Sequence, residues 1–168
     1  MEQLVEENKN VIMSFISEHI SYKEATKSNT ALRLDIDNTP DGYELGNMTG
    51  IAHNLFEPLR KWVGGPIKIN SFFRCKELNS AIGGSSRSQH CEGRAIDLDD
   101  TFGHKTNKDM FHYIKDNLNF DQLIWEFSDG ADAINPAWVH ISYINDNENR
   151  NRCLKAYKKD GKTHYVQV

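Results

Sequence analysis

The 168-residue sequence predicts an α+β fold, in which a helical N-terminal part packs on a small, mainly antiparallel sheet. Apolar residues at helical spacing dominate the first third of the chain, whereas alternating apolar and polar residues, typical of strands, appear after Pro66. Lys158-Lys159-Asp160-Gly161 then predicts the turn of a terminal hairpin. We expect one domain over residues 1–168, comprising N-terminal helices in 1–30, a core at about 30–145 and a hairpin at about 150–168.

Three helices are predicted before the first strand. The first covers residues 5–20, whose apolar positions are loosely helical in spacing: Val5, Ile12, Phe15, Ile16 and Ile20. Ser21 and Glu24 form the pattern of a capping box, which predicts a second helix running toward Leu34. The turn-forming residues 37–42 then precede a third helix.

The third helix is predicted from Leu45 to Val63. One face of it is apolar: Met48, Ile51, Leu55, Leu59 and Trp62. Pro58 lies inside this pattern, where it would kink or divide the helix, and Gly64-Gly65 ends it.

Strands dominate the rest of the chain, with two helices between them. A strand is predicted at 67–72, a short helix at 75–82 and a loop at 83–86. Further strands are predicted at 94–98, 120–127 and 137–144. A helix at 107–118 separates the first of these from the other two, with its inward residues at Met110, Tyr113, Ile114 and Leu118.

Composition excludes several classes of protein. The chain is 38% hydrophobic and 26% charged, with a net charge of -4 and no long basic tract, so we expect no nucleic-acid partner. No run approaches the ~20 apolar residues of a membrane span. The acidic start lacks the features of a signal peptide. Three cysteines (Cys75, Cys91 and Cys153) do not indicate a disulfide framework, which favours the reducing cytosol as the place of folding. We favour a monomer.

Three polar residues stand where apolar ones are expected. Asp97 lies between Ile96 and Leu98, and His140 between Val139 and Ile141. His90 precedes Asp97 by seven positions, and Gly93 lets the backbone turn between them. Buried charged groups are usually paired or bound to metal. Two imidazoles and one carboxylate are the donors of a catalytic zinc site, whose fourth position is left for water.

Further side chains would complete a hydrolytic site. Glu126 ends the apolar run Leu123-Ile124-Trp125 and is our first choice of base, with Asp132 as the second. Arg74 follows a strand and would orient a substrate carboxylate or stabilise an oxyanion. Ser88 and Gln89 are candidate hydrogen-bond donors beside His90, and either Trp125 or Trp138 would form a wall of the cleft.

These residues resemble the D-alanyl-D-alanine carboxypeptidase-like metallopeptidases of the M15 class, in particular the phage and bacterial branch. The resemblance covers roughly residues 30–145 in unbroken order. It rests on seven segments: Leu55 to Arg60, Pro66 to Arg74, Leu78 to Gly84, Ser88 to His90, Gly93 to Asp97, Phe120 to Glu126, and Trp138 to Ser142.

The resemblance implies a zinc peptidase acting on peptidoglycan stem peptides. It implies one Zn²⁺ held by His90, Asp97 and His140, with Arg74 contacting substrate. Some relatives place the catalytic acid three residues before the last histidine, where this chain has Ala137. Hedgehog signalling domains share the fold and have a tyrosine-tyrosine-glutamate motif similar to the segment that ends in Glu126, which supports that residue as the acid.

Other interpretations remain open. Asp97 could pair with Arg94 or Arg74, and Glu126 or Arg74 could be purely structural. Cys91 could offer a thiolate, although an extended backbone would turn it away from a metal bound by His90. Asp99-Asp100 is more typical of a solvated turn than of a second metal site. We expect the other histidines to be surface or packing residues: His19, His53, His104, His112 and His164.

The leading hypothesis is therefore a zinc-dependent peptidase of cell-wall stem peptides. The alternative is a non-catalytic, zinc-stabilised module that binds cell wall or belongs to a phage virion, and a third is a zinc hydrolase or lyase on another small peptide or amide. A cell-wall enzyme made in the cytoplasm without a signal peptide would act after lysis or aboard a phage particle. The resemblance alone supports that location.

Overall fold

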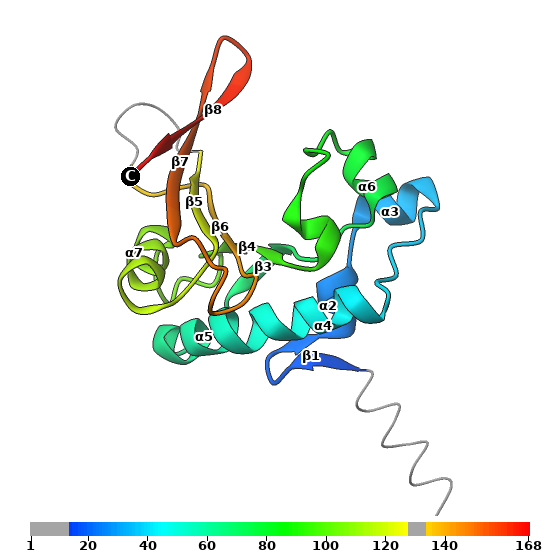
Figure 1. Cartoon of the computed structure of the whole chain (residues 1–168), viewed down its shortest axis with the longest axis horizontal. Coiled ribbons are helices and arrows are strands. Elements are labelled where there is room, and N and C mark those ends of the chain that lie inside the picture. Colours follow the sequence, from blue (N-terminus) through cyan, green and yellow to red (C-terminus); the bar gives the residue numbers. More distant parts are fainter. Residues whose placement is uncertain (1–13, 128–133) are drawn as a thin grey trace, which may run out of the picture.

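One six-stranded sheet organises the described part of the chain (Figure 1). The computed structural model describes residues 14–127 and 134–168. In the sheet the strands follow the order β3-β4-β6-β5-β7-β8. Their bounds are β3 Lys68–Ser71, β4 Ala95–Asp99, β5 Gln122–Glu126, β6 Trp138–Ser142, β7 Arg152–Lys159 and β8 Lys162–Gln167. All neighbours are antiparallel except β5 and β7, so the predicted α+β fold with a mainly antiparallel sheet is confirmed.

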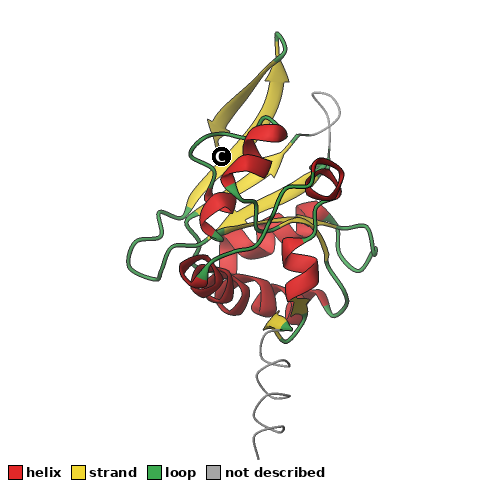
Figure 2. Ribbon diagram, turned by 90° about the vertical axis from the view of Figure 1, so that its right-hand side faces the viewer, coloured by secondary structure: helices red, strands yellow, loops and turns green. Residues whose placement is uncertain are grey.

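Helices cover one face of this sheet (Figure 2). Helix α4 (Gly42–Ile51), a π-helical segment (Ala52–Phe56) and helix α5 (Glu57–Val63) follow one another, and α7 (Asn107–Asn117) packs on β5 and β6. The core lies between the two layers. Both the helices and the strands contribute side chains to it, among them Met48, Leu55, Leu59, Ile96, Leu98, Met110, Ile114, Val139 and Ile141.

The third predicted helix differs from expectation at both its start and its centre. It begins at Gly42, because Asp41 forms a full capping box with Glu44, at 2.9 and 2.8 Å. It is not divided at Pro58, which lies in the first turn of α5, directly after the π-helical segment. Proline has no N–H to donate to the preceding turn, and a widened π turn accommodates that loss.

The prediction of a helix over residues 5–20 is wrong for its described part, and residues 1–13 lie outside the described residues. Strands β1 (Phe15–Ser17) and β2 (Ile20–Ser21) form a small hairpin there. Glu57 of α5 holds this hairpin by accepting hydrogen bonds from the Ser17 hydroxyl (2.6 Å) and the His19 backbone (2.9 Å). A tight hairpin buries Ile16 and Ile20 together just as one helical face would, so their spacing fits both structures.

The single helix predicted from Ser21 to Leu34 is two helices, α2 (Tyr22–Thr26) and α3 (Asn29–Leu34). Ser21 does cap the first, accepting from the Glu24 backbone at 3.1 Å. Ser28 caps the second in the same way, through the backbone N–H of Ala31 at 3.2 Å. A second capping serine with an extended backbone is what separates the two helices.

The other predicted elements lie where expected. Helix α6 (Lys76–Ala81), helix α7 and the β7–β8 hairpin match their predicted segments within a few residues. None of the helices in the described residues is long and apolar enough to cross a bilayer. All three cysteines are free.

Candidate metal centre

The register of the sheet brings Asp97 and His140 together. Asp97 of β4 lies directly opposite His140 of β6, which in turn lies opposite Ile124 of β5. Side chains alternate along a strand, so their neighbours Ile96, Leu98, Val139 and Ile141 enter the core on the opposite face. We call the face that carries Asp97, His140 and Glu126 the site face.

His90 reaches the same place from a short 3-10 helix, Gln89–Glu92. Gly93 ends this helix with a φ of 69°, and a Cβ there would lie 2.5 Å from the carbonyl oxygen of Glu44. Only glycine fits both the left-handed backbone and this close approach to α4. The predicted role of Gly93 as the turn before β4 is therefore confirmed.

One hydrogen bond fixes which nitrogen of His90 faces the carboxylate. Its Nδ1 lies 2.7 Å from the backbone carbonyl of Phe72, which can only accept, so Nδ1 carries the proton. Nε2 is then left with its lone pair, 3.2 Å from Oδ2 of Asp97. Metal-binding histidines are commonly oriented in this way by a backbone carbonyl.

The donor atoms fit a tetrahedral zinc site. Nδ1 of His140 lies 2.9 Å from Oδ1 of Asp97, and one ligand atom from each of the three residues lies within 4.8 Å of the other two. Donors around zinc at bond lengths of ~2.0–2.1 Å are about 3.3 Å apart. The two nitrogen–oxygen distances at Asp97, 2.9 Å to His140 and 3.2 Å to His90, are close to that value.

Electrostatics favours the protonation states that a metal requires. Burial, which leaves His90 only 2% exposed, lowers the pKa of its imidazole and keeps it neutral. Burial alone would raise the pKa of Asp97, but its interactions with the neighbouring imidazoles of His90 and His140 outweigh burial and hold that pKa well below its usual range. A neutral imidazole and an ionised carboxylate are the forms that bind zinc.

Glu126 lies on the same face, two positions along β5 from Ile124. Its side chain is only 7% exposed, and burial raises its pKa to about 7, an effect that the charge of Asp97 adds to and those of His140 and Lys158 oppose. A carboxyl group with a pKa near neutrality can both accept and donate a proton. The backbone N–H of Ala137 donates to the Glu126 carbonyl at 2.9 Å, so the two positions considered for the acid are neighbours.

Arg74 and Ser88 contact each other beside the candidate metal ligands. Nη2 of Arg74 donates to the Ser88 hydroxyl at 3.3 Å, and the buried Nε of Arg74 has no hydrogen-bond partner within the described residues. Burial lowers the pKa of Arg74, against the charges of Asp97 and Cys91. Arg94, the other arginine considered for Asp97, pairs with Glu92 at 3.5 Å. Arg74 therefore retains an unsatisfied donor.

Sequence reasoning missed a carboxylate that anchors the loop before His90. Asp121 is fully buried and accepts two hydrogen bonds from the Arg150 guanidinium, at 2.7 and 2.6 Å. The amide of Gln89 donates to the same carboxylate at 2.9 Å, which commits it to this cluster. Burial opposes ionisation of Asp121, but the hydrogen bonds from Arg150 and Gln89 lower its pKa overall. Asp121 lies directly before β5, and the sequence shows only an acidic residue next to Phe120, with nothing to indicate its role.

The two tryptophans proposed as cleft walls lie on different faces. Trp138 faces the site and packs at 5.3 Å, between ring centroids, on Phe127. Trp125 points to the helical face, where it meets Phe111 at 5.4 Å. The interpretation of Trp125 as a cleft wall is therefore wrong, because it alternates with Glu126 along β5.

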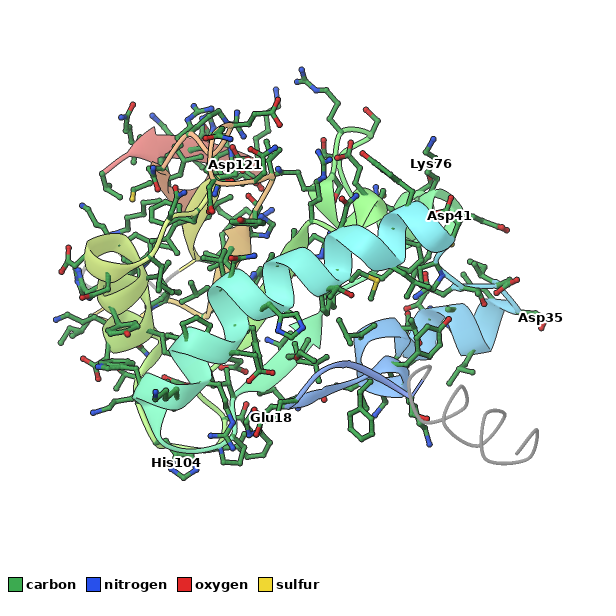
Figure 3. The ribbon with its side chains drawn as sticks, turned by 60° about the horizontal axis from the view of Figure 1, so that its bottom comes forward. Glu18, Asp35, Asp41, Lys76, His104 and Asp121 are labelled. Atoms are coloured by element: carbon green, nitrogen blue, oxygen red, sulfur yellow. The ribbon has the colours of Figure 1, made fainter. Side chains whose placement is uncertain are left out.

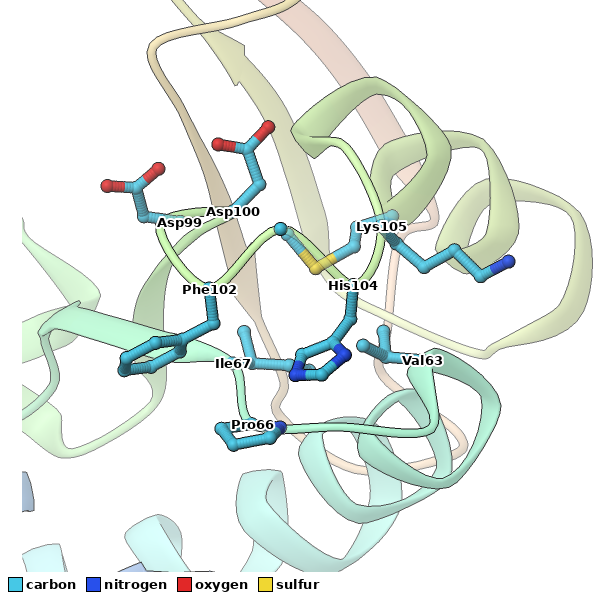
Figure 4. A pocket seen from close by; sticks show the side chains of 10 residues that line it. Val63, Pro66, Ile67, Asp99, Asp100, Phe102, His104 and Lys105 are labelled. Atoms are coloured by element: carbon cyan, nitrogen blue, oxygen red, sulfur yellow. The ribbon is translucent and has the colours of Figure 1, made fainter.

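Two other places are less suited to chemistry. Glu18, His19 and Glu57 form a second set of candidate ligands, of which Glu18 and His19 are exposed. Figure 3 shows Glu18 far from Asp121. Figure 4 shows a hollow between α5 and the segment after β4, lined by Pro66, Phe102 and His104, with no volume for a water molecule. Asp132, the second choice of base, lies outside the described residues.

Comparison with known families agrees with this geometry. The family model described as Peptidase M15 matches residues 18–142. The chain belongs to this family. Its members are zinc-dependent metallopeptidases, which fits the cluster of donors on the site face. No curated protein matches the chain. The family match ends at Ser142, the last residue of β6, so β7 and β8 lie beyond it.

Proposed function

We propose that this metallopeptidase holds one zinc ion through His90, Asp97 and His140 and hydrolyses a peptide bond in bacterial cell-wall stem peptides. The observation that carries the proposal is the convergence of those three donors on one face of the sheet, with a buried carboxyl group beside them. The substrate class rests on the resemblance of the motifs to cell-wall peptidases. A phage or cell-wall location belongs to the same proposal.

Each side chain has a defined task in this reaction. When bound, zinc would lower the pKa of a coordinated water toward ~7 and polarise the scissile carbonyl. Glu126 accepts a proton at its carboxylate and passes it to the leaving amine, for which a pKa near neutrality is suited. The guanidinium of Arg74 binds the substrate carboxylate or the developing oxyanion. Ser88 holds the Arg74 guanidinium in place, and Trp138 lines the cleft.

The non-catalytic alternative was based on Ala137, which stands where some relatives have the acid. The structure weakens that argument, because Glu126 lies on the adjoining strand beside Ala137 and is buried with a raised pKa. A module that only used zinc for stability would not need a carboxyl group held in this state. We therefore propose an enzyme rather than a binding module.

The proposal is tested by digesting purified peptidoglycan with the zinc-loaded protein and identifying the released peptides by mass spectrometry. We expect release that stops on chelation and returns when zinc is added back. The masses of the products identify the bond that is cut, and thereby separate carboxypeptidase from endopeptidase action. Zinc binding at one equivalent without any peptide release would favour the non-catalytic alternative.

A further inference from the structure

The β7–β8 hairpin extends the site face beyond the part of the chain that matches the family. Ala156 of β7 lies opposite Glu126 of β5, and Tyr165 of β8 lies opposite Ala156. Residues opposite each other in a sheet project from the same face. Tyr165 therefore belongs to the same row of the site face as Glu126 and Trp138.

The residue between them leaves space for the phenol. Neighbouring strands lie about 4.8 Å apart, so the backbones of Tyr165 and Glu126 are separated by about 10 Å. Ala156 between them has only a methyl group and is fully buried. A tyrosine side chain is long enough to cover most of this distance, whereas a larger residue at position 156 would block it. Tyr165 itself is 52% exposed, so a ligand on the site face can reach it.

The charges around the phenol agree with this placement. Burial raises the pKa of Tyr165, and the negative charges of Glu126 and Asp97 raise it further. The hydroxyl is thus protonated at neutral pH and is a hydrogen-bond donor. Within the described residues it has no hydrogen-bond partner, so this donor is free for a substrate oxygen.

Arg74 and Tyr165 lie at opposite ends of the site face. Arg74 follows β3 at one edge of the sheet, and Tyr165 is on β8 at the other, with Asp97, His140 and Glu126 on the strands between them. A peptide laid across the strands would meet Arg74 at one end and the hairpin at the other. Figure 1 shows the hairpin projecting from the sheet at the far side from α6.

We propose that the β7–β8 hairpin forms a second substrate-binding wall and that the Tyr165 hydroxyl donates a hydrogen bond to a carbonyl or carboxylate oxygen of the bound peptide. This inference rests on the proposed function. It adds a contact on the side of the scissile bond away from Arg74, made by a segment that the family match does not include. Tyr165 is a substrate-positioning residue and transfers no proton.

The test compares Tyr165→Phe with a matched control, Tyr157→Phe. Tyr157 lies one position from Ala156 and so projects from the other face, where it stacks on His164 with ring centroids 5.5 Å apart. Both substitutions remove one hydroxyl and keep the ring, so both proteins should fold as the wild type does. Loss of one hydrogen bond to a peptide oxygen corresponds to about a 5- to 10-fold weaker interaction.

Two readouts separate a binding role from a structural one. In kinetics on a synthetic stem peptide, Tyr165→Phe should raise KM about 5- to 10-fold and leave kcat within twofold, with Tyr157→Phe unchanged. In calorimetry on zinc-loaded Glu126→Gln, which prevents turnover, adding Tyr165→Phe should weaken peptide binding by the same factor. KM and Kd values equal to those of the control would overturn the inference while the proposed function stands. A wild-type protein that neither binds nor cleaves the peptide would overturn both.

Discussion

The two faces of the same strands differ sharply in what they contribute. On the helical face, Ile96, Leu98 and Val139 are fully buried among apolar side chains. On the site face, Asp97 lies between Ile96 and Leu98, and His140 follows Val139. Nδ1 of His140 lies 2.9 Å from Oδ1 of Asp97. Stability and chemistry are thus separated by a single step along the chain. Substitutions on neighbouring positions should therefore have different consequences, which can be measured.

The largest effect is expected on the site face at Asp97. Asp97→Asn keeps the shape of the side chain but removes the charge, so zinc binding should be lost and peptidase activity should fall more than about 100-fold. His90→Ala and His140→Ala should have the same effect. Metal analysis and a stem-peptide assay measure it, with the exposed Asp35→Asn as the matched control. One equivalent of zinc in all three site variants would contradict the ligand assignment.

The next effect separates metal binding from proton transfer on the same face. Glu126→Gln should retain zinc but lower kcat by about 10² to 10⁴, the range for a lost general acid or base. Steady-state kinetics and metal content, measured on one preparation, check it. Glu77→Gln on α6 serves as the control for removing a carboxylate elsewhere. Near-normal turnover of Glu126→Gln would move the base to Asp132 or another residue.

On the helical face the expected effect is on stability instead. Leu98→Ala should lower the free energy of unfolding by about 2 to 5 kcal/mol, because it leaves a cavity between the sheet and the helices. Urea unfolding followed by tryptophan fluorescence measures this. The folded fraction should still bind one zinc. Loss of the metal from folded Leu98→Ala would show that the two faces are not independent.

The smallest effect concerns pH and sharpens the contrast at Glu126. Because its pKa is raised from 4.5 to about 7, Glu126 holds a proton in the folded metal-free protein that it releases in the unfolded chain. Its contribution to the free energy of unfolding is therefore fully present below pH 4.5 and is lost as the pH rises through 7. Glu126→Gln removes this decline. Relative to wild type, it should therefore gain about 2 to 3 kcal/mol on going from pH 4.5 to pH 8. Parallel unfolding curves of the two metal-free proteins across this range would contradict the raised pKa.

The sequence predicted the grouping of His90, Asp97 and His140 better than what surrounds it, for a physical reason. Asp97 and His140 each stand between two apolar residues of a strand, and such a polar residue can be recognised without a structure. The Phe72 carbonyl that orients His90 could not be predicted, since every residue has a carbonyl and its direction depends on the fold. The ion pair of Asp121 and Arg150 joins positions far apart in the chain and leaves no local pattern.

Among the elements of the fold, α6, α7 and the β7–β8 hairpin were predicted, whereas the β1–β2 hairpin and the break between α2 and α3 were not. Helix α7 and the β7–β8 hairpin have enough residues for their period to be unambiguous. The β1–β2 hairpin has too few, and its contact with Glu57 of α5 decides its conformation. The order of the strands, with β6 between β4 and β5, depends on pairing across the sheet and could not be predicted from local patterns.

The hydrogen bond from His90 to the Phe72 carbonyl has a consequence for how the protein tolerates mutation. A main-chain acceptor is present whatever amino acid occupies position 72, so no exchange of that side chain deletes it. Only a shift of the backbone after β3 would release the imidazole ring. Most single-codon changes at position 72 should therefore leave the orientation of this histidine unchanged. Substitutions there should alter the packing of the side chain before they alter the position of the His90 ring.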